Sequence, residues 1–276
     1  MRIAGAFVLG LVLGAAFLQL LRPVLASPLL VRINHRGRHV PTAGGIVAVV
    51  AAACGTAAWW FVQPYGAVHA ALTTVLGFGL LGFVDDVLAA GADRGFTGHL
   101  RALSHGRLTT GGLKLLGGAV VGVLAAVPID GDQHGRLLLD AVLIALAANV
   151  GNLFDRAPGR TLKVGTVAAL AVLVLAPRRV LLTGPAIAVG AFLALLPADL
   201  NETIMLGDTG ANALGGVLGL AVVLTATFRI RMVVLVGLLF LNALSEVVSF
   251  SSVIERVAPL RWVDRAGRPP GYPEVP

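Results

Sequence analysis

Two adjacent carboxylates, Asp85 and Asp86, end an apolar run that begins near Gly66. If that run spans a membrane, each charge costs about 2.5–3.5 kcal/mol on insertion scales, so the pair needs a reason. Adjacent carboxylates also repel each other unless a cation lies close. The pair therefore indicates a metal site or a proton acceptor. An interfacial pair that only ends a helix explains two isolated residues equally well.

A second polar group lies in the stretch ANVGNLFDRAPGR. Asn149, Asn152 and Asp155 are spaced by three, so on a helix they fall within one broad face. Amide and carboxylate oxygens together suit a hard cation and the polar groups of a ligand. The alternative is a polar helix end before a Pro-Gly stop, because helices commonly finish in this way.

A third group is centred on Asp208, which Gly207 and Gly210 bracket just before another apolar run. Glycines let the backbone approach a phosphate closely, and the N-terminus of the following helix favours anions. Asp208 could ligate Mg²⁺, which prefers a few carboxylates plus substrate phosphates. An ordinary capping aspartate would look the same.

The composition indicates a membrane protein. The 276 residues are 57% hydrophobic and 13% charged, with a mean hydropathy of +0.89. About nine stretches approach the roughly 20 apolar residues that a spanning helix needs. No repeat or linker divides the chain, so we expect one domain over residues 1–276, an all-α bundle. The predicted segments are Ile3–Leu21, Gly44–Val62, Gly66–Val84, Gly111–Pro128, Leu137–Phe154, Val164–Ala176, Val180–Leu196, Thr209–Phe228 and Met232–Phe250.

The placement of positive charge predicts the orientation. Most of the 21 Lys and Arg residues fall in the loops that alternate with the first one, after Arg22. These loops are expected in the cytoplasm, which puts the N-terminus outside and the C-terminus inside. The net charge of +7 therefore reflects topology. The chain is expected to contact membrane lipids and no nucleic acid, since no soluble domain is available to bind it.

The three polar groups share one side of the membrane in this topology, although more than a hundred residues separate them. Lys114 and Lys163 fall on the same side, near the membrane surface, where an ammonium can hold a phosphate. Either lysine could instead extend to the interface as a topology residue, and this interpretation is preferred for Lys163. The cytoplasmic face is thus where chemistry is expected.

These motifs, in order and at their spacing, resemble the polyprenyl-phosphate N-acetylhexosamine-1-phosphate transferases, a superfamily that includes phospho-N-acetylmuramoyl-pentapeptide transferases and GlcNAc-1-phosphate transferases. The resemblance runs from about residue 34 to residue 265. The matching stretches are PTAGGIV (41–47), GFVDD (82–86), GGLKLLGG (111–118), NVGNLFD (149–155) and MLGDTGAN (205–212).

The resemblance implies an enzyme that transfers a sugar 1-phosphate from a UDP-sugar to a polyprenyl phosphate, releasing UMP. Mg²⁺ would be the cofactor. The protein would lie in a bacterial-type plasma membrane, with the site facing the cytoplasm. The implied catalytic residues are Asp85, Asp86, Lys114 and Asp208, with Asp208 and Asn152 reaching the metal. The product would enter cell-wall or cell-surface polymer synthesis.

The implied substrate-binding residues are Asn149, Asn152, Asp155 and Lys163. A homodimer is one option for the assembly. Pro158 stands where the superfamily often has an aspartate near the uridine, and Met205 stands where an aromatic residue often stacks on the base. These two departures suggest one alternative to the transferase, a catalytically altered homologue that binds polyprenyl phosphate without transferring sugar. A transporter or flippase is a further alternative, disfavoured because the carboxylates lie at helix ends without a visible repeat.

Overall fold

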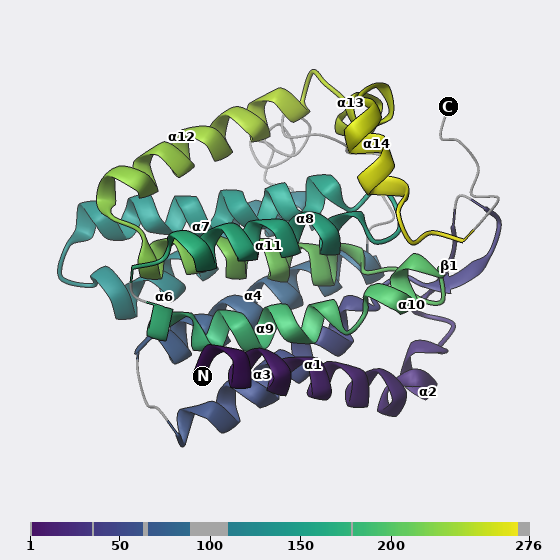
Figure 1. Ribbon diagram of the computed structural model, residues 1–276, viewed down its shortest axis with the longest axis horizontal. Helices are drawn as coiled ribbons and strands as arrows, with labels where there is room; N and C mark the ends of the chain where they lie inside the picture. The colour runs from purple at the N-terminus through teal and green to yellow at the C-terminus, as the bar shows by residue number, and fades with distance from the viewer. Residues whose placement is uncertain (1, 35, 63–65, 89–109, 178, 270–276) are drawn as a thin grey trace.

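The protein is a bundle of helices with one short β-hairpin at one end (Figure 1). The computed structural model describes residues 2–34, 36–62, 66–88, 110–177 and 179–269. In chain order the elements are α1 (Arg2–Leu20), α2 (Arg22–Leu25), β1 (Val31–Ile33), β2 (His39–Pro41), α3 (Gly45–Trp60), α4 (Gly66–Leu88), α6 (Thr110–Asp130), α7 (His134–Phe154), α8 (Arg160–Leu175), η1 (Arg179–Leu182), α9 (Thr183–Leu193), α10 (Leu196–Leu200), α11 (Gly207–Thr225), α12 (Phe228–Ser245), α13 (Phe250–Arg256) and α14 (Ala258–Arg265).

The predicted polytopic helical bundle is confirmed. Within the described ranges, seven helical spans are long and apolar enough to cross a membrane, and each predicted segment contains a helix. Two of those helices, α3 and α8, have only 16 residues each. The count of nine crossings, the direction of the termini and the single domain stay predictions.

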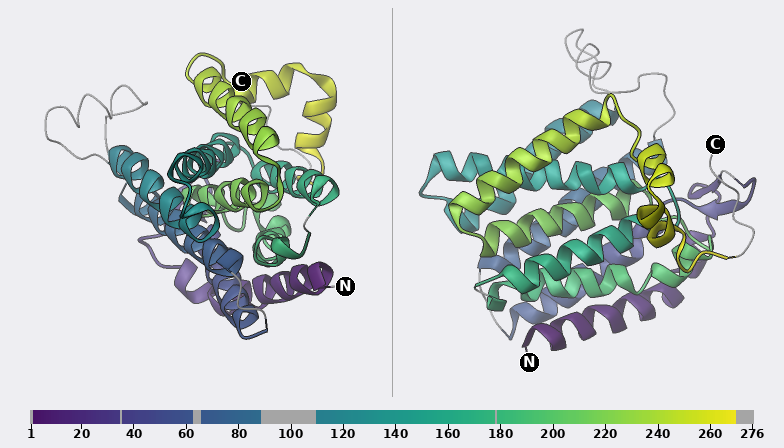
Figure 2. Two further views of the ribbon diagram at one scale, coloured as in Figure 1. Left: turned by 90° about the vertical axis from the view of Figure 1, so that its left-hand side faces the viewer. Right: turned by 45° about the horizontal axis from the view of Figure 1, so that its top comes forward.

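Helix α11 lies at the centre of the bundle and is buried along almost its whole length. Its glycines and alanines let the neighbouring α3, α4 and α7 approach closely, as small residues do in membrane helices. In contrast, α12 lies at the periphery, where only Leu235 is buried (Figure 2). The first residues of α11, which carry Asp208, are therefore held by several helices at once.

The β-hairpin holds the chain that leads into α11. Val31 pairs with Pro41 across the two antiparallel strands. The Pro41 carbonyl then accepts a hydrogen bond from Met205 N at 2.8 Å, and Met205 O accepts one from Gly44 N at 2.9 Å. These backbone bonds fix the loop before Gly207 against the start of α3.

The opposite end of the bundle has a separate charged cluster. Arg231 at the start of α12 forms an ion pair with Asp130 at 2.8 Å and another with Asp140, which is buried. Sequence analysis did not single out these residues. The cluster joins the ends of α6, α7 and α12, because two carboxylates share one guanidinium there.

Candidate active site

Asp86 is hydrogen-bonded to the first turn of α11. Its carboxylate accepts bonds from the backbone N–H of Asp208 (3.0 Å), the backbone N–H of Thr209 (2.9 Å) and the Thr209 hydroxyl (2.6 Å). No side chain within α11 caps this end, so Asp86 supplies the acceptor and the negative charge from α4. Asp86 thereby fixes the position of Asp208 in the first turn of α11.

Two glycines make this contact possible. A Cβ at Gly82 would overlap the backbone of Asp208 and Thr209, so only glycine lets α4 approach so closely. Gly207 has a φ of +70°, and a Cβ there would meet the Thr42 carbonyl and the Asp86 carboxylate. The GFVDD and LGDTG motifs therefore form one interlocked unit.

Four polar side chains from four helices converge beside this unit. Lys114 on α6 forms an ion pair with Asp208 on α11, and its Nζ lies 3.7 Å from Asp85 Oδ2 on α4. Asn152 on α7 has its amide nitrogen 2.6 Å from Asp208 Oδ1 and its oxygen 2.9 Å from Lys114 Nζ, in the orientation that satisfies both neighbours. Between 18% and 25% of the side chains of Lys114, Asp85 and Asp208 is exposed, so a ligand can reach them.

Asp155 lies just past the end of α7 and accepts a hydrogen bond from the Thr161 hydroxyl at 3.1 Å. Burial raises the pKa of Asp155 well above its ordinary value, and the negative charges of Asp199, Asp208 and Asp86 raise it further. Asp155 therefore lies in the same acidic region as Asp208 and Asp86. Its carboxyl group is directed to the start of α8.

The structure does not bring the other two predicted substrate-binding residues into this group. The Asn149 amide donates to Asn242 Oδ1 on α12 at 2.6 Å. Lys163 donates to the backbone carbonyls of Asp264 and Ala266, both at 2.7 Å. Each therefore ties a bundle helix to the C-terminal part of the chain.

Asp199 is a buried residue that sequence analysis passed over. Its carboxylate accepts hydrogen bonds from Gly159 N at 2.7 Å and Leu206 N at 3.2 Å. It thus joins the loop after Asp155 to the loop before Asp208. An acid just inside an apolar segment, in LLPADL, was the available signal.

The donor set fits a magnesium ion of the kind that also binds substrate. The part of the chain that the structure describes has no cluster of three or more His, Cys, Asp or Glu side chains suited to a metal. However, oxygens of Asp208, Asn152 and Asp85 already surround one cation, the Lys114 ammonium. Mg²⁺ at phosphate-transfer sites takes one or two carboxylates and completes its shell with water and phosphate.

The fold and site together define a helical membrane protein with a cation-holding polar site at one end of its bundle. No protein-family model matches the chain. Similar proteins are known, however. A phospho-N-acetylmuramoyl-pentapeptide-transferase of Moorella thermoacetica is 30% identical over 98% of this chain and 89% of its own length. Another, of Desulforudis audaxviator, is 30% identical over 88% of this chain and 80% of its own.

A third relative with the same name, from Granulibacter bethesdensis, is 28% identical over 95% of this chain and 79% of its own length. The chain belongs to the phospho-N-acetylmuramoyl-pentapeptide-transferase family, as a divergent member. The resemblance seen in the motifs is thereby confirmed. The helices and the relatives identify a multi-pass protein of the bacterial plasma membrane. They give no support to the predicted homodimer.

Proposed function

We propose that this protein transfers a sugar 1-phosphate, with N-acetylhexosamine 1-phosphate as the expected group, from a UDP-sugar to a polyprenyl phosphate. UMP is released at the cytoplasmic face, and the lipid product feeds cell-wall or cell-surface polymer synthesis. The convergence of Asp85, Lys114, Asn152 and Asp208 from four helices carries the proposal. The names of the relatives support the same class of reaction.

The charges of the site suit a reaction between two anions. A phosphate that attacks a diphosphate must be brought close to it against electrostatic repulsion, so positive charge and alignment matter most. Lys114 supplies one positive charge directly. Asp208 and Asn152 would hold Mg²⁺, which neutralises charge on the diphosphate when bound. Lys114 then remains available for a phosphate oxygen.

The two adjacent aspartates take different roles in this proposal. Asp85 faces Lys114 and would accept the remaining proton of the lipid phosphate. That phosphate, with a second pKa of about 6, is already largely ionised near neutral pH, so alignment matters more than base strength. Asp86 has its oxygens occupied by Asp208 and Thr209, so it acts as a positioning residue.

An apolar cavity next to the site supports a lipid acceptor. It has a volume of about 130 Å³ and lies between α7, α8, α11 and α12. Gly151 and Phe154, which flank Asn152 and Asp155 in sequence, line it together with Val164 and Leu214. We expect the first isoprene unit of the polyprenyl chain to lie against this surface while the phosphate meets Lys114.

UMP release tests this proposal. The purified protein, in vesicles that contain polyprenyl phosphate, is given a panel of UDP-sugars with Mg²⁺, and UMP is measured. We expect release with at least one donor, and none from Asp208→Ala. If lipid phosphate binds but no donor in the panel is turned over, the protein is instead the catalytically altered homologue. If the protein carries out proton- or sodium-coupled flux, it is instead a transporter.

A further inference from the structure

Helix α14 buries its acidic residue and exposes its large apolar side chains. Asp264, its acidic residue, is only 5% exposed and faces the bundle. Trp262 is 75% exposed, and Val263 and Leu260 are about half exposed. Such a surface would be unfavourable in water, because a tryptophan and aliphatic side chains are left without apolar contacts.

Buried ion pairs hold α14 in this orientation. Arg160 at the start of α8 binds both carboxylate oxygens of Asp264, at 2.7 and 3.0 Å. Arg268 pairs with the same carboxylate at 2.8 Å, and its Nε donates to the Pro158 carbonyl at 3.1 Å. Both guanidinium groups are almost fully buried. These ion pairs, on the opposite side of the helix, therefore fix the outward direction of Trp262.

The exposed apolar surface of α14 continues that of α12. The side chains of Val236 and Phe240 on α12 and of Val247 just beyond it are 62–81% exposed, and Val253 of α13 is 40% exposed. α12 is one of the spans long and apolar enough to cross a membrane, so its exposed side faces lipid. Helix α14 runs crosswise to the bundle helices at the end that holds the site (Figures 1 and 2).

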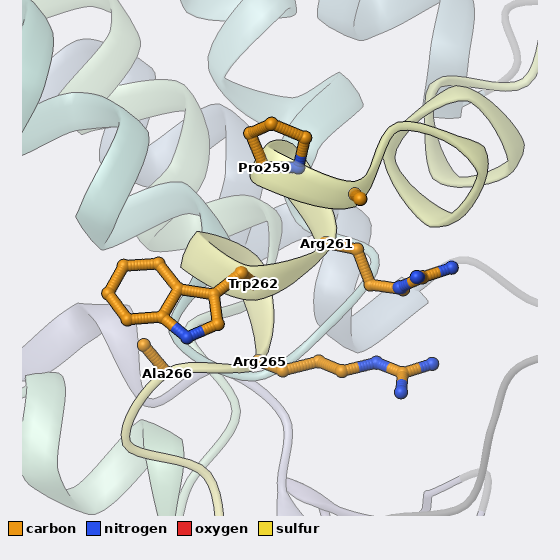
Figure 3. Close-up of a pocket in the computed structure, with 6 residues that line it drawn as sticks. Pro259, Arg261, Trp262, Arg265 and Ala266 are labelled. Carbon is orange, nitrogen blue, oxygen red and sulfur yellow. The ribbon is translucent and has the colours of Figure 1, made fainter.

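Basic residues flank the apolar surface. Around α14, Trp262 points to one side and Arg261 and Arg265 to the other, around a cavity of about 690 Å³ (Figure 3). Arg256, at the end of α13, is exposed, while Arg261 and Arg265 are half-buried. Glu255 pairs with Arg265 at 2.8 Å and offsets part of this charge, which leaves the surface positive. Tryptophan and arginine together favour the boundary between acyl chains and anionic head groups.

We propose that α13 and α14 form a docking surface for anionic phospholipids of the inner leaflet. Trp262 and Val263 enter the boundary of the acyl chains, while Arg256 and Arg261 bind the lipid phosphates. The charge of the arginines and the continuity with the lipid-facing side of α12 favour lipid over a second copy of the chain. The proposal does not depend on the reaction that the site catalyses.

Lipid quenching of tryptophan fluorescence tests the apolar contact. Trp59→Phe and Trp60→Phe leave Trp262 as the sole tryptophan of the chain. The protein is placed in nanodiscs, one chain per disc, that contain phosphatidylcholine brominated near the carbonyl or near the chain end. We expect stronger quenching by the shallow bromine. Trp262→Phe in the otherwise native chain, which should lose the quenched component, checks the assignment without altering the other two tryptophans.

Charge selectivity is tested with brominated phosphatidylglycerol and brominated phosphatidylcholine at equal fractions. Each arginine near an anionic surface is worth a factor of about five in local lipid preference. We expect phosphatidylglycerol to quench several-fold more effectively, and Arg256→Gln with Arg261→Gln to remove most of this preference. Arg38→Gln, an exposed change on the hairpin at the same end, is the matched control and should have no effect.

Three results would overturn the proposal. Equal quenching by the two lipids would remove the role of anionic head groups. Efficient quenching of Trp262 by aqueous acrylamide, with none by brominated lipid, would place the surface in water. If Trp262 became shielded only in discs that hold two chains, the surface would instead be an interface between copies.

Discussion

Asp86 accepts three hydrogen bonds from the first residues of α11, whereas Asp85 lies 3.7 Å from the Lys114 ammonium. A carboxylate that satisfies buried N–H groups contributes mainly to stability, since its loss leaves donors without partners. A carboxylate beside a partly exposed lysine at the edge of the site is better placed to meet substrate. The two neighbours should therefore respond differently to the same substitution.

Asp85→Asn and Asp86→Asn form a matched pair that tests this difference. We expect Asp85→Asn to lower kcat by a factor of about 10², the low end for loss of a proton acceptor because the lipid phosphate is already largely ionised, while the thermal midpoint stays unchanged. Asp86→Asn should destabilise the fold by about 1–2 kcal/mol, because an amide N–H₂ would face the N–H groups of α11. UMP release and thermal unfolding in the same detergent measure both effects. An unchanged midpoint for Asp86→Asn would contradict the positioning role.

At the scale of the elements, α14 is attached to the bundle by ion pairs that centre on Asp264. Burial alone would raise the pKa of Asp264, but hydrogen bonds and charge from Arg160 and Arg268 outweigh it and lower that pKa below its ordinary value of 3.8. A lowered pKa means that the carboxylate stabilises the folded state above pH 3.8. This contribution is lost as pH falls through the lower, folded-state value.

The attachment of α14 should therefore be insensitive to pH between 7 and 4. Hydrogen exchange of residues 250–268 is expected to stay slow over that range and to accelerate only below about pH 3.8. Asp264→Asn should accelerate exchange at every pH, because it leaves Arg160 and Arg268 buried with no counter-charge, a cost of about 3–5 kcal/mol. Faster exchange of the native chain already at pH 5 to 6 would count against this assignment.

Sequence patterns predicted the elements better than the directions of their side chains. Long apolar runs such as Gly66–Leu88 mark spanning helices directly, because the bilayer fixes their length. The spacing of Asn149, Asn152 and Asp155 was less informative. Residues three apart on a helix still differ by about 60° in direction, and Asn149 reaches α12 while Asn152 reaches Asp208.

Long-range contacts explain what sequence analysis missed. Lys163 binds carbonyls about a hundred residues away, and Asp199 joins two loops that are far apart in the chain. Neither the carbonyl partners of Lys163 nor the backbone N–H partners of Asp199 can be predicted from local sequence spacing. The grouping of Asp85, Lys114 and Asp208 was predicted from charge placement, which put all three on one side of the membrane, and from the resemblance of their motifs to a known superfamily.

At the scale of the whole molecule, the two ends of the bundle carry different chemistry. The hairpin, α14 and the site lie at one end, and the Arg231 cluster lies at the other. The positive-inside rule assigns the site end to the cytoplasm. This orientation is the basis for expecting soluble UDP-sugar as the donor.

Cysteine labelling tests the orientation. Cys54 is the sole cysteine, so Cys54→Ser gives a background for His39→Cys on the hairpin and Asp132→Cys between α6 and α7, both at exposed positions. In right-side-out vesicles, a membrane-impermeant maleimide should label Asp132→Cys at once and His39→Cys only after permeabilisation. The reverse pattern would put the site outside the cell.

The central claim is that side chains from α4, α6, α7 and α11 meet around one divalent cation and the phosphates of the substrates. The dependence of UMP release on Mg²⁺ concentration tests it most directly, in the native chain and in Asp208→Asn. The account predicts no release after EDTA treatment, recovery on addition of Mg²⁺, and a requirement for at least tenfold more Mg²⁺ in Asp208→Asn, about 1.4 kcal/mol of lost binding. Release that persists in EDTA, or an unchanged Mg²⁺ requirement in Asp208→Asn, would contradict it.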